Sequence, residues 1–561
     1  MPTGARLLVE ALKDEGVKYV FGYPGGAVLP VYDEIYDETD VEHILVRHEQ
    51  GAAHAADGYA RVTGEPGVCM ATSGPGATNL VTGIATAYMD SSPVIAITGQ
   101  VPTSMIGNDA FQEVDAVGVF MPITKHNYQV TDPADVPRVV KEAFLVATKG
   151  RPGPVHIDLP KDVQESETDA EVPRKVHVEG LRVVTRGHPR QIKRAAELLA
   201  EAERPVILAG GGCVISGAQR ELMELAELLG APVATTLMGK GAFPETHPLA
   251  LGMAGMHGTK AANYALTECD VLLAVGCRFS DRTTGDPEGF APDAKVIHVD
   301  IDPAEIGKNI EPDVPIVGDA KSVLRELVKE LRGRKSLRER TKWGERIEEL
   351  KREVEMPPED WEEEARVSPK HLVRALYDAL KDVDHVVVTD VGQNQMWMAR
   401  YFPVEEPRSF ISSGGLGTMG FGLPAAMGAK VGAPEKEVVA VLGDGGFLMT
   451  AQELATAVDN DIPIKAFVMD NRLLGMVAQW QRLFYEERLS ESVLDERTDI
   501  VTLTEAYGAT GLVVDDPTEL DSVVEEALDT PGPVVVDVMV DPEEIVPMVP
   551  PGGKLRDLIG D

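Results

Sequence analysis

A carboxylate and an amide follow two apolar runs of the chain at a spacing that suits a bound metal ion. Asp444 lies in the sequence GDGG after the run 438–442 (VVAVL), and Asn471 follows the run 464–469 (IKAFVM) closely. Such runs are typical of buried parallel strands, whose carboxyl ends meet at one edge of a sheet. A carboxylate, an amide oxygen and a nearby backbone carbonyl suit Mg²⁺, which often shares its coordination with ligand phosphates.

The segment between these two runs predicts a helix over 451–458. The N-terminus of such a helix would present N–H groups to a phosphate, and the preceding glycines would let the backbone approach it. A tight turn with an exposed aspartate has the same Gly-Asp-Gly letters, so the tripeptide alone is a weak signal. The spacing to Asn471 makes the pattern more specific, and it predicts a metal–diphosphate site.

The region around Asp444 repeats an earlier part of the chain. With a shift of 370 positions and no gap, the expected strands, turns and helices fall on one another. Identical residues in the two copies include the pairs Ala55/Ala425, Ala56/Ala426, Gly58/Gly428, Val68/Val438, Gly76/Gly446 and Pro93/Pro463. Two copies of one fold are therefore expected at the two ends of the chain.

The two copies differ at the positions that matter for chemistry. Gly74 takes the place of Asp444 in the first copy, and Met419 takes the place of Glu49 in the second. One copy would hold the diphosphate, and the other would offer a carboxylate at the equivalent sheet edge. A ligand between unlike copies would touch both, which favours a dimer or a larger assembly.

Alternating apolar runs and helical patterns predict three α/β units with doubly wound parallel sheets. Their expected bounds are 1–162, 188–333 and 368–545, and a Pro- and Gly-rich tail over 546–561 could act as a lid. In the middle unit Gly210, Gly211 and Gly212 follow a strand, but no GxGxxG motif is present, so its nucleotide signal is weak. The charged stretch 332–366 is predicted to be a solvated linker.

Composition narrows the function classes. The chain has 561 residues, and 91 acidic against 53 basic side chains give a formal net charge of −38, which repels nucleic acids and anionic membranes. Four cysteines without CxxC spacing are expected to be buried and reduced, and no apolar run is long enough to span a membrane. A cytoplasmic location is the expectation.

Nine motifs, in order, resemble the thiamine-diphosphate enzymes, and specifically the acetolactate (acetohydroxyacid) synthase catalytic subunits, over essentially the whole chain. They are 22–27 (GYPGGA), 48–53 (HEQGAA), 98–102 (TGQVP), 107–113 (GNDAFQE), 150–154 (GRPGP), 158–161 (DLPK), 278–282 (RFSDR), 476–480 (MVAQW) and 546–550 (VPMVP). The resemblance implies two related thiamine-diphosphate-binding folds flanking a central FAD-binding domain, with thiamine diphosphate, Mg²⁺ and FAD as cofactors.

The resemblance also implies roles for individual residues. Glu49 would share a proton with the aminopyrimidine of thiamine. Catalytic or active-site roles fall on Glu49, Gln112, Lys161, Arg282 and Trp480. Thiamine diphosphate would contact Tyr23, Pro24, Gly25, Gly26, Glu49, Gln393, Gly417, Met419, Gly443, Asp444, Gly445, Gly446, Met449, Asn471, Gly475 and Met476. Mg²⁺ would bind Asp444, Asn471 and the carbonyl of Leu473.

FAD would lie in the middle unit without a net redox role. Its expected contacts are Arg151, Gly211, Gly212, Thr236, Leu237, Met256, His257, Gly276, Arg278, Arg282, Asp300, Ile301 and Asp319. The chain departs from the family at Asp470, where Asn is usual, and at Ser280, where Asp is frequent. The second departure puts one flavin contact in doubt.

The implied reaction is the decarboxylation of pyruvate and transfer of the hydroxyethyl unit to a second 2-ketoacid. Arg282 would bind the carboxylate of that acceptor, although a salt bridge to Asp281 or Asp286 is an alternative role. Trp480 would favour 2-ketobutyrate as the acceptor, because the indole would make apolar contact with the extra methyl group of that ketoacid. Such a contact is worth about 1–3 kcal/mol. Expected partners are a second copy, as a homodimer or homotetramer, and a small regulatory subunit.

Three other readings remain. Pyruvate oxidase shares the scaffold but would need oxygen or another electron acceptor. Glyoxylate carboligase is disfavoured, because that family has an apolar residue where Glu49 stands. A nucleotide-binding scaffold that has lost catalysis is the non-enzymatic alternative, and the intact Glu49, Asp444 and Asn471 argue against it.

The net charge of −38 predicts a protein adapted to a salt-rich cytoplasm. Salt at about 1 M shortens the Debye length to about 3 Å, which weakens repulsion among the acidic side chains. We expect the thermal midpoint of unfolding to rise steadily as KCl is added from low concentration. An unchanged midpoint across that range would contradict this prediction.

Overall fold

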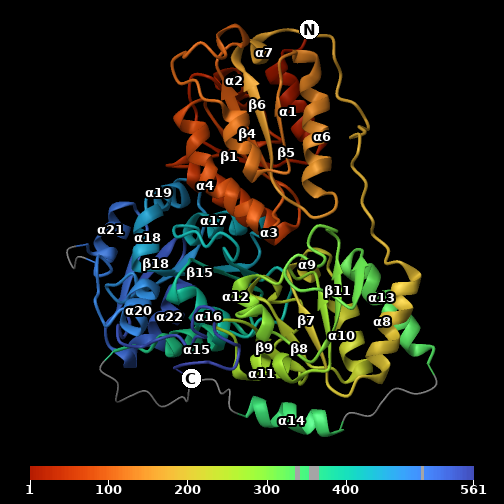
Figure 1. The fold of residues 1–561 in the computed structure, drawn as a ribbon. Helices are drawn as coiled ribbons and strands as arrows, with labels where there is room; N and C mark the ends of the chain where they lie inside the picture. The colour runs from red at the N-terminus through yellow and green to blue at the C-terminus, as the bar shows by residue number, and fades with distance from the viewer. Residues whose placement is uncertain (335–340, 353–365, 495–497, 561) are drawn as a thin grey trace.

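Three parallel sheets follow one another along the chain (Figure 1). The computed structural model describes residues 1–334, 341–352, 366–494 and 498–560. Each sheet has six strands, and helices cover both of its faces. The predicted fold class, three doubly wound α/β domains, is confirmed. Within the described residues, no helix is long and apolar enough to cross a membrane.

The N-terminal sheet has the strand order β2-β1-β3-β4-β6-β5. Its strands are β1 (Tyr19–Gly22), β2 (Glu42–Leu45), β3 (Gly67–Ala71), β4 (Val94–Gln100), β5 (His126–Gln129) and β6 (Val155–Pro160). The helices are α1 (Gly4–Asp14), α2 (Leu29–Tyr36), α3 (Glu49–Thr63), α4 (Pro75–Met89), α5 (Ala116–Phe120), α6 (Val136–Thr148) and α7 (Lys161–Glu165). Thr3 caps α1, since its side chain accepts a hydrogen bond from the Arg6 N–H.

The C-terminal sheet has the same order, β14-β13-β15-β16-β18-β17, which agrees with the internal repeat. Its strands are β13 (His385–Thr389), β14 (Phe410–Ile411), β15 (Glu437–Gly443), β16 (Lys465–Asp470), β17 (Thr510–Val514) and β18 (Val534–Met539). The helices are α15 (Pro369–Leu380), α16 (Gln393–Tyr401), α17 (Gly422–Gly432), α18 (Asp444–Thr450), α19 (Glu453–Asp459), α20 (Gly475–Phe484), α21 (Ile500–Ala506) and α22 (Leu520–Asp529).

The central sheet is ordered differently, β12-β11-β10-β7-β8-β9. Its strands are β7 (Pro205–Ala209), β8 (Val233–Thr235), β9 (Ala250–Met253), β10 (Val271–Val275), β11 (Lys295–Asp300) and β12 (Val314–Val317). Its helices are α8 (Pro189–Glu201), α9 (Gly211–Ile215), α10 (Gln219–Leu229), α11 (Lys260–Glu268), α12 (Asp281–Thr284), α13 (Ala320–Arg332) and α14 (Thr341–Lys351). After β7, strands β8 and β9 are added on one side of the sheet, whereas β10, β11 and β12 are added on the other, so the strand order reverses between β7 and β10. Ligands of doubly wound sheets bind at such a switch point.

The two related domains pack directly against each other through α3 and α17 (Figure 1). Glycines allow the two helix backbones to touch. A Cβ atom built on Gly58 would lie 2.0 Å from the carbonyl oxygen of Ala425, and one on Gly428 would lie 1.8 Å from that of Ala55. Buried side chains of both domains therefore form a single hydrophobic cluster around this crossing.

Two sequence expectations need correction. The helix expected over 451–458 is present as α19, but a helix that was not expected, α18, precedes it from Asp444, and a break near Gln452 separates the two. The stretch 332–366 is not wholly a solvated linker, since α14 buries Trp343, Ile347 and Leu350 against the central domain. Its segments 335–340 and 353–365 lie outside the described residues. The domain boundaries themselves stay a prediction.

The α3–α17 crossing predicts that Gly428 tolerates no side chain. We expect Gly428→Ala to lower the free energy of unfolding by about 1–3 kcal/mol, because its Cβ would overlap the Ala55 carbonyl. Gly344→Ala on α14 is the matched control, since a Cβ there meets nothing within 4 Å. Thermal unfolding of both variants tests the prediction, and equal midpoints would contradict it.

Candidate active site

A small cavity of about 60 Å³ lies at the carboxyl edge of the C-terminal sheet. Gly443 ends β15 and Asp444 begins α18 without a connecting loop, while Asn471 directly follows β16. Nine residues predicted to bind thiamine diphosphate line the cavity together with Leu473. They are Gln393, Met419, Gly443, Asp444, Gly445, Gly446, Asn471, Gly475 and Met476.

Asp444 has an unsatisfied carboxylate oxygen in this cavity. Its Oδ1 accepts a hydrogen bond from the Gly445 N–H at 2.8 Å, whereas its buried Oδ2 has no partner among the described residues. Burial and the charge of neighbouring Asp470 raise the pKa of Asp444 well above its ordinary value. A divalent cation would satisfy the free oxygen and offset both effects, so the residues fit a metal ion.

The Asn471 amide is held in one orientation by its neighbours. Its Nδ2 donates to Oε1 of Gln393 at 3.1 Å, and its Oδ1 accepts from the Leu473 N–H at 3.0 Å. Asp444, Asn471 and Leu473 thus line the same small cavity. Their roles as metal ligands stay a prediction.

Asp390, which the sequence reasoning missed, organises the loop that carries Met419. This buried carboxylate follows β13 and accepts hydrogen bonds from the backbone N–H groups of Val391, Gly420 and Gly422 at 2.7, 3.1 and 2.9 Å. Burial raises the pKa of Asp390 to about 6. The signal was present in the sequence, because Asp390 ends the apolar run HVVVT as Asp444 ends another.

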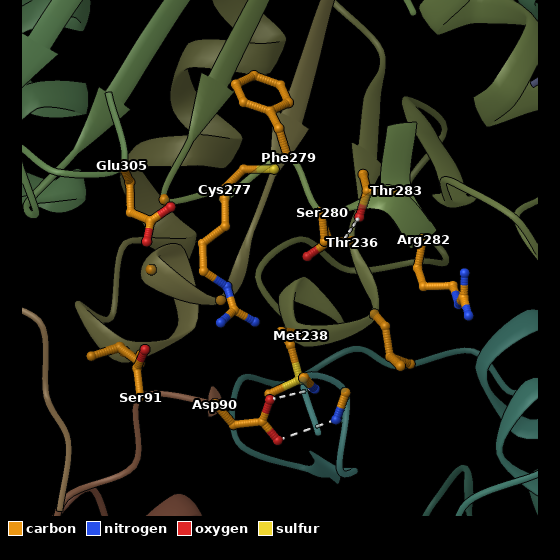
Figure 2. A pocket seen from close by; sticks show the side chains of 18 of the residues that line it. Asp90, Ser91, Thr236, Met238, Cys277, Phe279, Ser280, Arg282, Thr283 and Glu305 are labelled. Carbon is orange, nitrogen blue, oxygen red and sulfur yellow. Dashed lines mark hydrogen bonds between the residues drawn. The ribbon is translucent and has the colours of Figure 1, made fainter. Parts of the chain in front are cut away.

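A much larger cavity, of about 850 Å³, lies where the three domains meet. Its size is in the range of cofactor pockets. All thirteen residues predicted to bind FAD line it. They are Arg151, Gly211, Gly212, Thr236, Leu237, Met256, His257, Gly276, Arg278, Arg282, Asp300, Ile301 and Asp319. Figure 2 shows side chains of this cavity and the neighbouring loop of the C-terminal domain.

The large cavity has the features of a dinucleotide site. The turns after β7 and β10 are in backbone contact, because a Cβ on Gly212 would lie 2.7 Å from the Cα of Gly276. Asp300 ends β11, where an acidic side chain can bind ribose hydroxyls. Burial raises the pKa of Asp300 to about 6. These residues fit a flavin dinucleotide, and their individual contacts stay predictions.

Glu305 is a second residue that the sequence reasoning missed. Its Oε1 accepts a hydrogen bond at 2.7 Å from Arg151, which also donates to the Ser91 hydroxyl at 2.8 Å. Its buried Oε2 has no partner among the described residues (Figure 2). No local pattern could have revealed this pair, since 154 positions separate the two side chains.

A buried ionic cluster fixes one wall of the large cavity. Arg61 on α3 binds Asp57 through two hydrogen bonds of 2.8 and 2.9 Å and binds Asp90 at 2.8 Å. Asp90 in turn accepts from the N–H groups of Gly414 and Gly415, which line the cavity (Figure 2). The N-terminal domain therefore positions a loop of the C-terminal domain.

Arg282 and Trp480 lie together at the large cavity. The guanidinium is 5.9 Å from the centre of the indole, within cation–π range. The alternative salt bridge is also present, since Arg282 contacts Asp281 at 2.8 Å. That pair is exposed and contributes little, which leaves the guanidinium available to a ligand carboxylate.

The structure brings Arg151 of the N-terminal domain to the large cavity, but leaves the predicted thiamine-diphosphate and catalytic residues of that domain outside both cavities. Glu49 begins α3 and accepts a hydrogen bond at 2.9 Å from Asn79, a residue that the sequence reasoning missed. The predicted residues that line neither cavity are Tyr23, Pro24, Gly25, Gly26, Glu49, Gln112, Lys161 and Met449, and Gly417 lines the larger cavity. Glu49 and Asp444 thus lie at separate sites within one chain.

Comparisons with known proteins show similarity over the whole chain. The family models described as "Thiamine pyrophosphate enzyme" match residues 2–119 (N-terminal TPP binding domain), 192–327 (central domain) and 390–538 (C-terminal TPP binding domain). The chain is 59% identical to the "Probable acetolactate synthase large subunit" of Methanocaldococcus jannaschii, over 99% of this chain and 95% of the relative.

Two further relatives carry related names. The "Acetolactate synthase large subunit" of Corynebacterium glutamicum is 49% identical over 99% of this chain and 90% of its own. The "Acetolactate synthase isozyme 3 large subunit" of Escherichia coli K12 is 47% identical over 100% of this chain and 98% of its own.

The contact between the turns after β7 and β10 predicts that Gly212 is needed for flavin binding. We expect Gly212→Ala to reduce the flavin bound after purification at least tenfold, because its Cβ would push the two turns apart. Gly333→Ala, at the end of α13, adds a Cβ with no contact closer than 3.5 Å and is the control. Flavin absorbance per protein measures the effect, and equal absorbance in both variants would contradict it.

Proposed function

The chain belongs to the thiamine pyrophosphate enzymes and, among them, to the acetolactate synthase large subunits, and we propose the following reaction for it. Pyruvate is decarboxylated, and its hydroxyethyl unit joins a second 2-ketoacid. Pyruvate as acceptor gives 2-acetolactate, and 2-ketobutyrate gives 2-aceto-2-hydroxybutyrate. This is the first common step of branched-chain amino-acid biosynthesis, and we place it in the cytoplasm.

The free Oδ2 of Asp444 carries the proposal. A buried carboxylate without a partner is unfavourable, and its position beside Asn471 and the carbonyl of Leu473 suits Mg²⁺. The metal would neutralise this carboxylate and hold the diphosphate against the glycine-lined end of β15. Thiamine diphosphate, when bound, supplies the electron sink that decarboxylation needs.

Glu49 is proposed to hold the proton that activates the cofactor. As the first residue of α3, it follows strand β2 closely and is oriented by the Asn79 amide. A carboxyl group at the aminopyrimidine stabilises the tautomer that accepts the proton, and positioned proton transfer of this kind contributes about 10²–10⁴-fold to a rate.

A second copy of the chain is proposed to complete each active site. Glu49 lines neither cavity, so one subunit alone does not join the carboxylate to the diphosphate site. Large apolar side chains are exposed near both half-sites, among them Phe111 at 87% and Met449 at 52%. Burial of these side chains between copies supports a homodimer or homotetramer. A smaller regulatory subunit is proposed because the relatives are named large subunits.

FAD is proposed to occupy the large cavity with a structural role. Arg282 would bind the carboxylate of the acceptor ketoacid, and Trp480 would contact the extra methyl group of 2-ketobutyrate. The cation–π contact between them supports a shared acceptor pocket. The same flavin site could serve an oxidase, so the test must separate the two activities.

The decisive test is an assay without oxygen. Protein in high salt receives pyruvate, Mg²⁺, thiamine diphosphate and FAD, and acetolactate, acetate and acetaldehyde are quantified. We expect acetolactate, with a loss of about 10²-fold or more in Glu49→Gln. Glu42→Gln, an exposed residue of the same domain, is the matched control and should retain activity.

Acetate that forms only after oxygen or an electron acceptor is admitted, without acetolactate, would reassign the protein to the oxidases. Full activity of Glu49→Gln would remove Glu49 from the mechanism while leaving the synthase assignment intact.

A further inference from the structure

A chain of amide hydrogen bonds links the candidate metal ligand Asn471 to the C-terminal tail. The Asn471 Nδ2 donates to Oε1 of Gln393 at 3.1 Å, and the Gln393 Nε2 donates to Oε1 of Gln479 at 2.9 Å. Gln479 then binds the backbone of Val546, the first residue of the tail. Three side-chain amides, one directly after β16, one on α16 and one on α20, therefore connect to a segment that begins 67 positions beyond Gln479.

Gln479 forms a peptide-like pair with Val546. Its Nε2 donates to the Val546 carbonyl at 2.8 Å, and its Oε1 accepts from the Val546 N–H at 2.9 Å. The side chain is 1% exposed on a helix in which only Ala478 is also buried. A buried amide is stable only when its polar atoms are paired, so Gln479 and the tail backbone depend on each other.

The tail continues from this pair onto the central domain. The Val549 N–H donates to the Met256 carbonyl at 2.7 Å, and His257 Nδ1 lies 3.0 Å from the Pro547 carbonyl. Met256 and His257 both line the large cavity. The tail residues 546–549 are buried, which makes this segment a strap between the two candidate cofactor sites.

The two bonds between the side-chain amides run in one direction, from Asn471 through Gln393 to Gln479. Asn471 and Gln393 each use the amide nitrogen as donor toward the tail, and Gln479 Oε1 accepts from both Gln393 and Val546. This polarity keeps the amide oxygen of Asn471 away from Gln393 and on the side where it meets the Leu473 backbone. A shift at Asn471 would disturb Gln393 and, through it, the Gln479–Val546 pair.

We propose that Gln479 is a positioning residue that couples occupancy of the metal–diphosphate site to docking of the C-terminal tail. The proposal rests on the proposed function, because it takes Asn471 as a metal ligand. Gln479 lines neither candidate cofactor cavity. It holds residues 546–549 on the central domain. A bound metal would fix the side chain of Asn471, and the hydrogen bonds through Gln393 would then restrict the motion of Gln479 and of the tail residues bound to it.

Hydrogen–deuterium exchange of the C-terminal peptide tests the proposal in the full-length protein. The informative amide is that of Val549, since its acceptor is Met256 and not Gln479. In the wild-type protein we expect Mg²⁺ with thiamine diphosphate to slow exchange in this peptide. In Gln479→Met we expect exchange about tenfold faster without ligands, because the two hydrogen bonds to the Val546 backbone and the one to the Met548 sulfur are lost. We expect no further slowing when the ligands are added.

Two further variants make the result specific. Gln393→Met cuts the link to Asn471 and also removes a 3.3 Å hydrogen bond to the Glu544 carbonyl, just before the tail. It leaves the Gln479–Val546 pair, so residues 546–549 should stay protected and lose only the response to ligands. Gln481→Met is the matched control on the same helix, because Gln481 binds Ser490 and Ser492 rather than the tail. It should exchange like the wild type, and thermal midpoints of all variants identify any general loss of stability.

The outcomes are distinct. Wild-type exchange in Gln479→Met, with or without ligands, would overturn the proposal. A response to ligands that survives in Gln393→Met would overturn the coupling. Calorimetry with Mg²⁺ and thiamine diphosphate gives a separate answer on the site, because absent binding in the wild type would refute the proposed function. The comparison of unliganded Gln479→Met with wild type would still decide whether Gln479 holds the tail.

Discussion

The contact of α3 with α17 is the constraint on which the rest of the molecule depends. Gly58 and Gly428 let the two backbones touch, so two related domains share one hydrophobic cluster. Because α3 also carries Glu49 at its first turn and Arg61 near its last, the same contact fixes the proton-relay candidate and the ionic cluster that holds the cavity wall. Geometry at both cavities therefore follows from a packing distance between small residues.

Buried carboxylates near the ends of strands and helices differ in whether hydrogen bonds pair both of their oxygens. Asp390 and Asp90 accept backbone N–H groups and thereby fix loops at the two cavities. Asp444, which follows the neighbouring strand β15, keeps one oxygen without a partner among the described residues. This difference distinguishes carboxylates that stabilise loops from one that can bind a ligand. Burying an unpaired carboxylate oxygen costs free energy unless a bound cation interacts with that oxygen.

Much of the fold and of the candidate site could be predicted from the sequence, since apolar runs mark buried parallel strands and the repeat marks two related sheets. The start of α18 at Asp444 could not, because three glycines around that residue disfavour a helix that tertiary packing then imposes. Glu305, Asp90 and Gln479 were missed for another reason. Their partners lie 154, 324 and 67 positions away, and no local pattern records such pairs.

The pairing of α3 with α17 also has a consequence for biosynthesis. Gly58 and Gly428 are 370 positions apart (428 − 58), so the small-residue face of α3 leaves the ribosome long before its partner exists. At about 5–20 residues per second, that interval lasts roughly 20–70 s. Throughout it the N-terminal domain carries an uncovered apolar helix, which makes the nascent chain a natural client for chaperones and sets the period of greatest risk of aggregation.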